Sequence, residues 1–458
     1  MMADTNTEIR KIIEFFNTSL PISKQKNELE INNTVQEIIA GYEEKKYDFS
    51  SYESLTLKQK SKKRVVKQFK DWSLEKTLCI LLKRCLDREF KIKYPNRNDQ
   101  LQILFEKMAS IQNMKDFTII RFDFLDFFNT ISSEYVYLKF IKNSSLERFK
   151  KELLQNFVDG CKYCYAGINT SNVMAEIISQ HFDQLVKQNF YDKGLIFYRR
   201  YVDDGVLIFN RFLSEDEGKY CLNMALKSTF YDTCISVSNS CNTSLNMAPG
   251  KFTYITKRYL DNAIGSKLIF GFLGYQFILS SDNKHKTIIK YGITNDKIQK
   301  YTKKIVKIAN DYKIDNNIEL LRHRLKAFSC RTVYRRKNYS AKIWKSKGFI
   351  SNYNELRYYL NMLDPSTEAF LKNGIKDALI SAGVAIPYFL KGHTDKSPYS
   401  MYYNLNKNRT LLFEENERIG INMATLVKMC GQVGITSTGN KTYNALLREY
   451  LIKIKVGH

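Results

Sequence analysis

The sequence predicts an α+β fold, in which an antiparallel sheet packs with helices, followed by a mainly helical region. Apolar, β-rich runs broken by turn residues occur at 117–124, 195–209 and 267–279, as expected for a strand and two hairpins. Between the first two runs, residues 172–185 carry apolar side chains at the three- and four-residue spacing of a helix. Strand, helix, hairpin and hairpin in this order predict one sheet domain over about 117–280.

The regions before and after the sheet domain have other patterns. Residues 1–116 have mainly helical spacing and include a basic run at 58–70 that contains no acidic residue. A solvent-exposed helix face is as good an interpretation of this run as a binding surface. Residues 351–458 are predicted to be mainly helical and contain no motif that indicates chemistry.

The charge of the chain favours a polyanionic partner. Lys and Arg total 72 against 47 Asp and Glu, a net charge of +25. Nucleic acid is the first candidate partner, and an anionic membrane is the second. The membrane is disfavoured because no apolar run reaches the roughly 18 residues that a membrane span requires. No signal-peptide pattern is present near the first residue, so we expect a cytoplasmic protein.

More than half of the excess charge lies in one segment. Residues 281–350 contain 19 Lys and Arg against 5 Asp and Glu, and aromatic residues are interspersed with them. This composition is typical of an element that follows a phosphate backbone and packs on sugars or bases. We predict a helical element here, with four candidate contacts to nucleic acid: Arg331, Arg335, Arg336 and Lys337.

Three carboxylates are the candidate catalytic residues. Asp123 ends the first predicted strand, and Asp203 and Asp204 lie at the predicted turn of the hairpin that follows. Extension of a nucleic-acid strand by two metal ions requires converging oxygen ligands for those ions. The three acids can converge if the two strands are neighbours in one sheet. An Asp-Asp-Gly sequence alone would be an ordinary turn, so the order of the motifs carries the argument.

Across about 58–350, the motifs resemble the reverse transcriptases. Tyr201-Val-Asp-Asp204 resembles the YxDD box of that family, and 121–131 resembles its first palm motif, with Asp123 as metal ligand. Phe128 then occupies the steric-gate position that selects deoxynucleotides. The resemblance implies a right-hand polymerase. It would comprise an N-terminal helical region and fingers (1–116), a palm with part of the fingers at 129–166 (117–280), a basic helical thumb (281–350) and a helical C-terminal region (351–458).

Further site residues follow from the resemblance. Gly167 and Ser171 lie in a stretch similar to the second palm motif and would contact the nucleotide, although Tyr165-Ala166 replaces the usual Pro-Gln. Lys63 and Arg64 resemble the fingers pair that holds the triphosphate. The segment similar to the primer grip comprises Phe272, Leu273, Gly274 and Tyr275. Lys251 is the candidate acid for the leaving pyrophosphate, with a solvated lysine as the alternative.

The departures in the second motif and the helical tail resemble the defence-associated reverse transcriptases of the abortive-infection and unknown groups, which are related to the retron enzymes. This implies an RNA-directed DNA polymerase in antiphage defence that uses two Mg²⁺ ions, or Mn²⁺, and dNTPs. The implied partners are an RNA template or noncoding RNA, the DNA product, and a second copy or second subunit. Three alternatives stay open: template-independent or protein-primed synthesis, an RNA polymerase or terminal transferase, and a catalytically silent nucleic-acid-binding protein.

Overall fold

The fold was taken from a computed structural model, which describes residues 2–20, 25–59, 62–338, 341–392, 396–415, 419–436 and 438–455. It is a mixture of helices and strands, which confirms the predicted α+β class. Contacts within the chain divide it into two compact units, unit 1 (Met1–Ala263) and unit 2 (Ile264–His458). Each unit is described by itself.

Unit 1 contains a four-stranded antiparallel sheet of strand order β4-β5-β3-β6 and a two-stranded sheet, β1-β2. Its elements are α1 (Met2–Ser19), α2 (Glu28–Glu43), β1 (Glu53–Gln59), β2 (Lys62–Gln68), α3 (Leu74–Glu89), α4 (Arg97–Ile111), β3 (Thr118–Asp123), α5 (Phe127–Thr130), α6 (Ser133–Val136), η2 (Tyr137–Ile141), α7 (Arg148–Gly160), α8 (Asn169–Asn189), η3 (Tyr191–Lys193), β4 (Leu195–Tyr201), β5 (Asp204–Phe209), α9 (Glu215–Phe230), β6 (Thr253–Thr256) and α10 (Lys257–Asn262).

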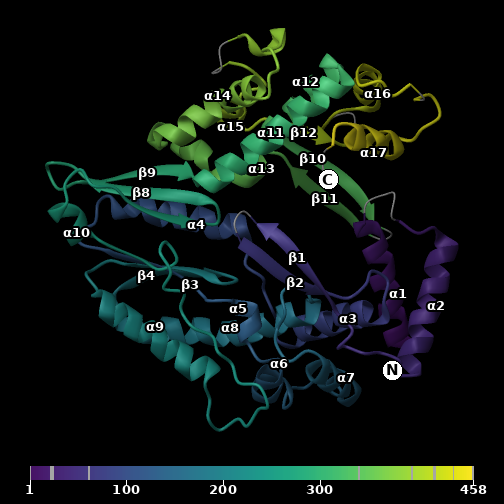
Figure 1. Cartoon of the computed structure of the whole chain (residues 1–458), viewed down its shortest axis with the longest axis vertical. Coiled ribbons are helices and arrows are strands. Elements are labelled where there is room, and N and C mark those ends of the chain that lie inside the picture. The colour runs from purple at the N-terminus through teal and green to yellow at the C-terminus, as the bar shows by residue number, and fades with distance from the viewer. Residues whose placement is uncertain are drawn as a thin grey trace. The chain divides into compact units, whose positions relative to one another are not determined.

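Strand β3 is central in the four-stranded sheet, and its surroundings explain its sequence. It pairs with β5 on one side and β6 on the other, and all six of its residues are buried. A strand buried on both faces does not need the alternation of apolar and polar residues seen in a half-exposed strand. Helices α8 and α9 lie along one face of this sheet and α4 lies on the other side (Figure 1).

Most of the basic run at 58–70 lies on strand β2, with Lys58 on β1, so its interpretation as a helix face is wrong. Strands β1 and β2 pair in register from Glu53 opposite Gln68 to Gln59 opposite Lys62. The β-branched residues Val65 and Val66 favour a strand at this place. Lys63 and Arg64 are in β2, but their side chains lie outside the described residues.

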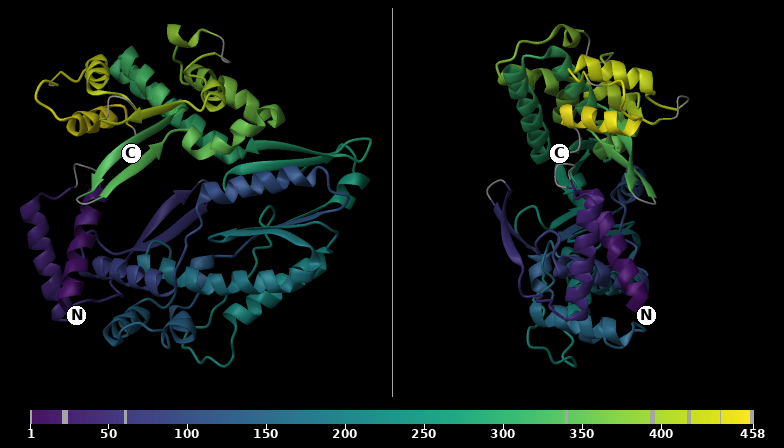
Figure 2. Two further views of the ribbon diagram at one scale, coloured as in Figure 1. Left: turned by 180° about the vertical axis from the view of Figure 1, so that it is seen from behind. Right: turned by 90° about the vertical axis from the view of Figure 1, so that its right-hand side faces the viewer.

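Unit 2 contains two three-stranded sheets, of strand order β7-β8-β9 and β11-β10-β12. Its elements are β7 (Leu268–Phe272), β8 (Tyr275–Ser281), β9 (Thr287–Ile293), α11 (Asn295–Asp315), α12 (Ile318–Ser329), β10 (Arg331–Asn338), β11 (Ala341–Lys347), α13 (Ile350–Tyr353), η4 (Asn354–Met362), α14 (Pro365–Ser381), η5 (Tyr388–Leu390), α15 (Met401–Asn406), β12 (Thr410–Phe413), α16 (Met423–Gln432) and α17 (Tyr443–Lys453). Figure 2 shows these elements from two further directions.

The prediction of a helical element over 281–350 is wrong in part. Helices α11 and α12 are present, but three strands, β9, β10 and β11, accompany them. In β9, buried and exposed residues alternate from Thr287 to Tyr291, with the period of two that is typical of a strand. The helical prediction rested on the number of basic residues and did not use this spacing. Strand β8 pairs with β9, and the hairpin β7-β8 lies in unit 2, which begins at Ile264.

The region 351–458 is mainly helical, as predicted. Strand β12 is the exception, and it pairs in parallel with β10, with Arg331 opposite Thr410. Helices α16 and α17 pack with β12 around a core that includes Phe413, Leu426 and Tyr450. None of the helices in the described parts of the chain combines the length and apolar character needed to cross a membrane.

Candidate active site

The sheet of unit 1 brings the three predicted carboxylates together. Strands β3 and β5 are antiparallel neighbours, and Asp123 lies directly opposite Asp204 in their register. The backbone N–H of Phe124 donates to the carbonyl of Asp203 at 3.0 Å, which joins the end of β3 to the turn before β5. The two strands are therefore neighbours in one sheet, which is the condition on which the convergence of the acids was predicted.

The turn that carries Asp203 differs from the predicted Asp-Asp-Gly turn. Tyr201 pairs with Asp204, so the two-residue loop consists of Val202 and Asp203. Val202 has a φ of 60°, a region that is strained for a β-branched residue. Gly205 lies within β5 and does not form the turn. A Cβ there would lie 2.3 Å from the ring of Phe122, so this glycine makes room for a core side chain.

Arg121 connects the acids with the loop after α9. It lies two residues before Asp123 on β3, so both side chains are on the same face of the sheet. Its Nε donates to Asp204 at 2.8 Å, and its Nη2 lies 3.7 Å from Asp123. Its Nη1 donates to the carbonyls of Gly250 and Lys251 at 2.7 and 2.9 Å. The buried guanidinium thus supplies the counter-charge for two acids and positions a loop beside them.

That loop supplies two further contacts to Asp123. The ammonium of Lys251 lies 2.7 Å from one carboxylate oxygen of Asp123. Asn246 donates its backbone N–H to the Asp123 carbonyl at 2.7 Å and its side-chain amide to the carboxylate at 3.3 Å. The structure therefore places the partly exposed Lys251 side chain beside Asp123, and its role in proton transfer stays a prediction.

The protonation of Asp204 reflects its buried position. Burial raises the pKa of Asp204 to about 6, and the attraction of Arg121 opposes this shift. Repulsion from Asp123 and Asp203 raises the pKa further. The folded protein therefore binds a proton at Asp204 more tightly than an ordinary aspartate would.

We predict that Asp204→Asn stabilises the metal-free protein at high pH. A raised carboxyl pKa gives stability that is full below about pH 4 and is lost as the pH rises through about 6. The unfolding free energy of Asp204→Asn minus that of the wild type should therefore increase by up to about 3 kcal/mol between pH 4 and pH 8. Urea unfolding in EDTA measures it. Asp126→Asn, which changes an exposed acid nearby, is the control, and an equal shift in both variants would contradict the assignment.

A buried ion-pair network supports the turn from the other side. Arg200 on β4 donates to Asp183 at 2.9 and 3.0 Å and to Glu176 at 3.0 Å, both on α8, and to the carbonyl of Val202 at 2.8 Å. The hydroxyl of Tyr198 donates to Asp183 at 2.6 Å. Burial alone would lower the pKa of Arg200, but the two carboxylates raise it. The network fixes the backbone next to Asp203.

The segment predicted to be the second palm motif packs against strand β2 of the same chain. A Cβ on Gly167, whose φ is 105°, would lie 2.4 Å from the carbonyl oxygen of Lys67 on β2. The Lys67 N–H donates to Ala166 at 2.9 Å, and its ammonium lies 3.2 Å from the ring centroid of Tyr165. The glycine therefore permits the close approach of strand β2. Tyr165, one of the two residues that replace the usual Pro-Gln, contacts Lys67 of that strand through its ring.

Other predicted nucleotide contacts have different surroundings. Phe128 is half-buried and packs edge-on against Phe127, with ring centroids 5.3 Å apart. Ser171 is fully buried, and its hydroxyl has no partner among the described residues. The structure therefore leaves the Phe128 ring partly accessible but does not bring Ser171 to a surface that a nucleotide could reach.

The predicted primer grip forms the tip of hairpin β7-β8 in unit 2. Leu273 and Gly274 both have positive φ, as in a type I′ turn. Phe272 and Tyr275 face the core and are almost fully buried. Only the two turn residues are thus placed at the hairpin tip, and Phe272 and Tyr275 have a packing role in unit 2.

The basic residues of unit 2 that were predicted to contact nucleic acid differ in the partners that they already have within the chain. Arg335 lies 3.5 Å from Glu414, and its guanidinium lies 4.8 Å from the ring centroid of Trp344. Arg331 donates to Asn354 and makes no ion pair within the described part of the chain. The side chains of Arg336 and Lys337 lie outside the described residues.

Several residues around the acids were not predicted from the sequence. Arg121, Asn246 and Arg200 each contact an acid of the site or the turn that carries one. The period-two alternation of strand residues could have identified Arg121, because it places positions 121 and 123 on one face. In unit 2, helix α11 exposes a row of lysines that were not singled out: Lys300, Lys303, Lys304 and Lys307.

The acids fit a divalent cation by their chemistry. Carboxylate oxygens are the donors that Mg²⁺ prefers, and a divalent cation would relieve the repulsion of Asp204 by Asp123 and Asp203. In the described residues, no three His, Cys, Asp or Glu side chains are arranged as a ready metal site. Lys251 and Arg121 bind the acid oxygens instead. The Mg²⁺ or Mn²⁺ requirement stays a prediction.

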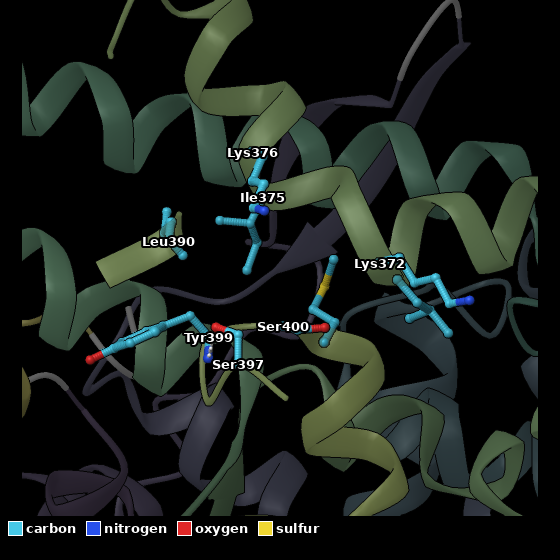
Figure 3. Close-up of a pocket in the computed structure, with 9 residues that line it drawn as sticks. Lys372, Ile375, Lys376, Leu390, Ser397, Tyr399 and Ser400 are labelled. Atoms are coloured by element: carbon cyan, nitrogen blue, oxygen red, sulfur yellow. Dashed lines mark hydrogen bonds between the residues drawn. The ribbon is translucent and has the colours of Figure 1, made fainter. Parts of the chain in front are cut away.

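Unit 2 contains a small pocket. Figure 3 shows Ile375 and Lys376 of α14, Leu390 of η5 and Tyr399 around it. None of the predicted site residues lines this pocket.

The comparisons with known proteins do not identify a family for this chain. No protein-family model matches the sequence, and a search of curated proteins gives no match.

Proposed function

We propose that the chain is a nucleotidyltransferase of the reverse transcriptase type, which adds deoxynucleotides to a nucleic-acid strand. The observation that carries this proposal is the arrangement of the three acids. Asp123 and Asp204 are directly opposed on adjacent antiparallel strands, and Asp203 occupies the turn between β4 and β5. An ordinary Asp-Asp-Gly turn would not need a third acid opposite it or a buried arginine between the strands.

The residues around the acids have separate tasks in this proposal. Asp123, Asp203 and Asp204 would hold the metal ions, which when bound supply the Lewis-acid stabilisation of the attacking and leaving oxygens. Arg121 and Asn246 orient the acids, and Arg200 holds the turn. Lys251, on the loop that Arg121 positions, is the candidate proton donor to pyrophosphate. The lysines of α11 are candidate contacts to phosphates.

The biological setting is proposed from the net charge of the chain and from its resemblance to defence-associated enzymes. The net charge supports a nucleic-acid partner, and we propose an RNA template or a bound noncoding RNA, with a DNA product. The resemblance to defence-associated enzymes supports an antiphage role in the cytoplasm, acting as an oligomer or with a second subunit.

The experiment that tests the function is incorporation of labelled dNTPs by the purified chain with Mg²⁺, together with sequencing of any co-purifying nucleic acid. Incorporation that follows a bound RNA sequence would establish templated synthesis. Incorporation without RNA would establish the template-independent or protein-primed alternative. No incorporation with Mg²⁺ or Mn²⁺ would contradict the polymerase.

A catalytically silent nucleic-acid-binding protein is the second candidate. The observation that favours it is the pairing of Asp123 with Lys251 and of Asp204 with Arg121, which neutralises acids that a metal ion would need. Such a protein would bind nucleic acid through the basic surface of unit 2 and would bind no Mn²⁺ at the acids. Manganese binding followed by electron paramagnetic resonance separates the two candidates.

We predict that Phe128→Ala broadens sugar selection. The half-buried ring of Phe128 is held by Phe127, and its removal would open the position where a 2′-hydroxyl is excluded. The ratio of ribonucleotide to deoxynucleotide incorporation should rise by about 10-fold or more, the factor that 1.4 kcal/mol of discrimination corresponds to. Competition between labelled rNTPs and dNTPs measures this ratio. Phe140→Ala, which alters a partly buried ring on η2, is the control, and an unchanged ratio in Phe128→Ala would remove the gate assignment.

A further inference from the structure

One face of strands β10 and β11 carries cationic and aromatic side chains. Positions 331, 333 and 335 of β10 share a face by alternation. Because Arg335 is opposite Trp344 and Val333 is opposite Ser346, these two residues of β11 are on the same face. We call this surface the Arg331 face. Its aromatic member, Trp344, is 46% exposed.

The segment α13-η4 borders the Arg331 face at the Arg331 end. Two hydrogen bonds join them, Ser346 to Ser351 at 2.7 Å and Arg331 to Asn354 at 2.8 Å. One turn after Asn354, the guanidinium of Arg357 lies over the ring of Tyr358, 4.4 Å from its centroid. Tyr358 is 65% exposed, so most of its surface remains open beside two arginines.

The guanidiniums of Arg331 and Arg357 repel each other. Burial lowers the pKa of Arg331, and Arg357 lowers it further, while Glu355 acts in the opposite direction. Glu355 is buried, and the hydroxyl of Tyr275 donates to its carboxylate, so this acid is already engaged. Neither arginine forms an ion pair within the described ranges of the chain. Nη2 of Arg357 donates to the hydroxyl of Tyr358, and its buried Nε has no acceptor there. Two such neighbours favour an anionic ligand between them.

We infer that the Arg331 face and its η4 border bind a single nucleic-acid strand. Arg331 and Arg357 would bind phosphates, because a guanidinium donates a fork of hydrogen bonds that matches phosphate oxygens. Tyr358 and Trp344 would stack on bases. A single strand is the ligand that uses both features, because the base faces of a duplex are not accessible to a side-chain ring. This inference rests on the proposed function and assigns a role to part of the region 351–458.

Anisotropy of labelled oligo-dT and of a blunt duplex of equal length, titrated with the full chain, tests the inference. All proteins carry Asp203→Asn, so no strand is extended during the measurement. Arg331→Gln and Arg357→Gln should each reduce the slope of log affinity against log salt by about 0.7 for oligo-dT. Tyr358→Ala and Trp344→Ala should weaken oligo-dT binding by about 5- to 150-fold without changing that slope. Duplex binding should change less.

Matched variants separate binding from folding. Arg357→Lys keeps the charge and should keep the slope, and Tyr358→Phe keeps the ring and should keep the affinity. Arg148→Gln and Tyr191→Ala, which alter an exposed arginine on α7 and an 88% exposed tyrosine, are the controls. Thermal unfolding of each protein shows whether it is folded. The inference would be overturned if folded Arg331→Gln and Arg357→Gln each kept the wild-type affinity for oligo-dT and its salt dependence. It would also be overturned if the variants lost equal affinity for the single strand and for the duplex.

The result is separate from the test of polymerase activity. If the wild type incorporates dNTPs while the four variants bind oligo-dT normally, the strand-binding face is wrong and the polymerase stands. If no protein incorporates dNTPs but the four variants lose binding as described, the face stands and the polymerase is wrong.

Discussion

Asp203→Asn should abolish nucleotide addition while the protein remains folded and bound to nucleic acid. Asp203 is half-buried in the two-residue turn, and its backbone carbonyl, which the substitution preserves, accepts the bond from Phe124. The change removes one negative charge from the three-acid cluster. Loss of one preorganised electrostatic contact typically costs about 10²–10³ in rate, and loss of a metal ligand should cost at least that.

The measurement pairs incorporation of labelled dNTPs with anisotropy of a bound oligonucleotide. Asp126→Asn is the matched control, because Asp126 is an exposed acid on the segment after β3 and accepts a hydrogen bond from Asn129 at 2.8 Å. This variant should retain incorporation. Normal incorporation by Asp203→Asn would remove the proposed centre, and joint loss of incorporation and binding would show that the acid acts on folding.

The fold class and the convergence of the acids could be predicted because both follow from short-range patterns. A buried strand ending in Asp123 and a hairpin interrupted by an acid pair are visible within a few residues. Their antiparallel pairing then follows if both strands lie in one sheet. The location of the turn was less predictable, because Asp and Gly are common in two-residue hairpin turns, whereas the β-branched Val202 is not. The ring of Phe122, distant in sequence, requires the glycine inside β5.

The errors arose where composition was used in place of periodicity. The lysines at 58–70 and in 281–350 indicated a helix, but residues 62–68 form strand β2, and in strand β9 buried residues alternate with the exposed Ile288 and Lys290. Residues contributed by distant segments could not be predicted either. Arg200 is an ordinary strand residue in the sequence, and its interactions depend on two acids, Glu176 and Asp183, that lie about two turns apart on α8.

Arg200→Met should destabilise the protein strongly and also impair catalysis. The side chain of Arg200 is 1% exposed, and its removal would leave Asp183 and Glu176 as neighbouring buried carboxylates without a counter-charge. Breaking a buried pair in this way typically costs about 3–5 kcal/mol. Val202 would also lose its donor at a strained backbone position. Urea unfolding and dNTP incorporation measure the two effects. Arg199→Met, which alters the adjacent and more exposed arginine, should change both much less.

A compensated variant distinguishes positioning of the turn from stability alone. In Arg200→Met/Glu176→Gln/Asp183→Asn the unpaired charges are removed, and most of the lost stability should return, because neutral amides can bond to each other and to Tyr198. The Val202 carbonyl still lacks its donor in this protein. If Arg200 positions Asp203 through that carbonyl, kcat should remain low with KM for dNTP little changed, even though the unfolding free energy recovers. Recovery of kcat together with stability would show that the network acts only on folding.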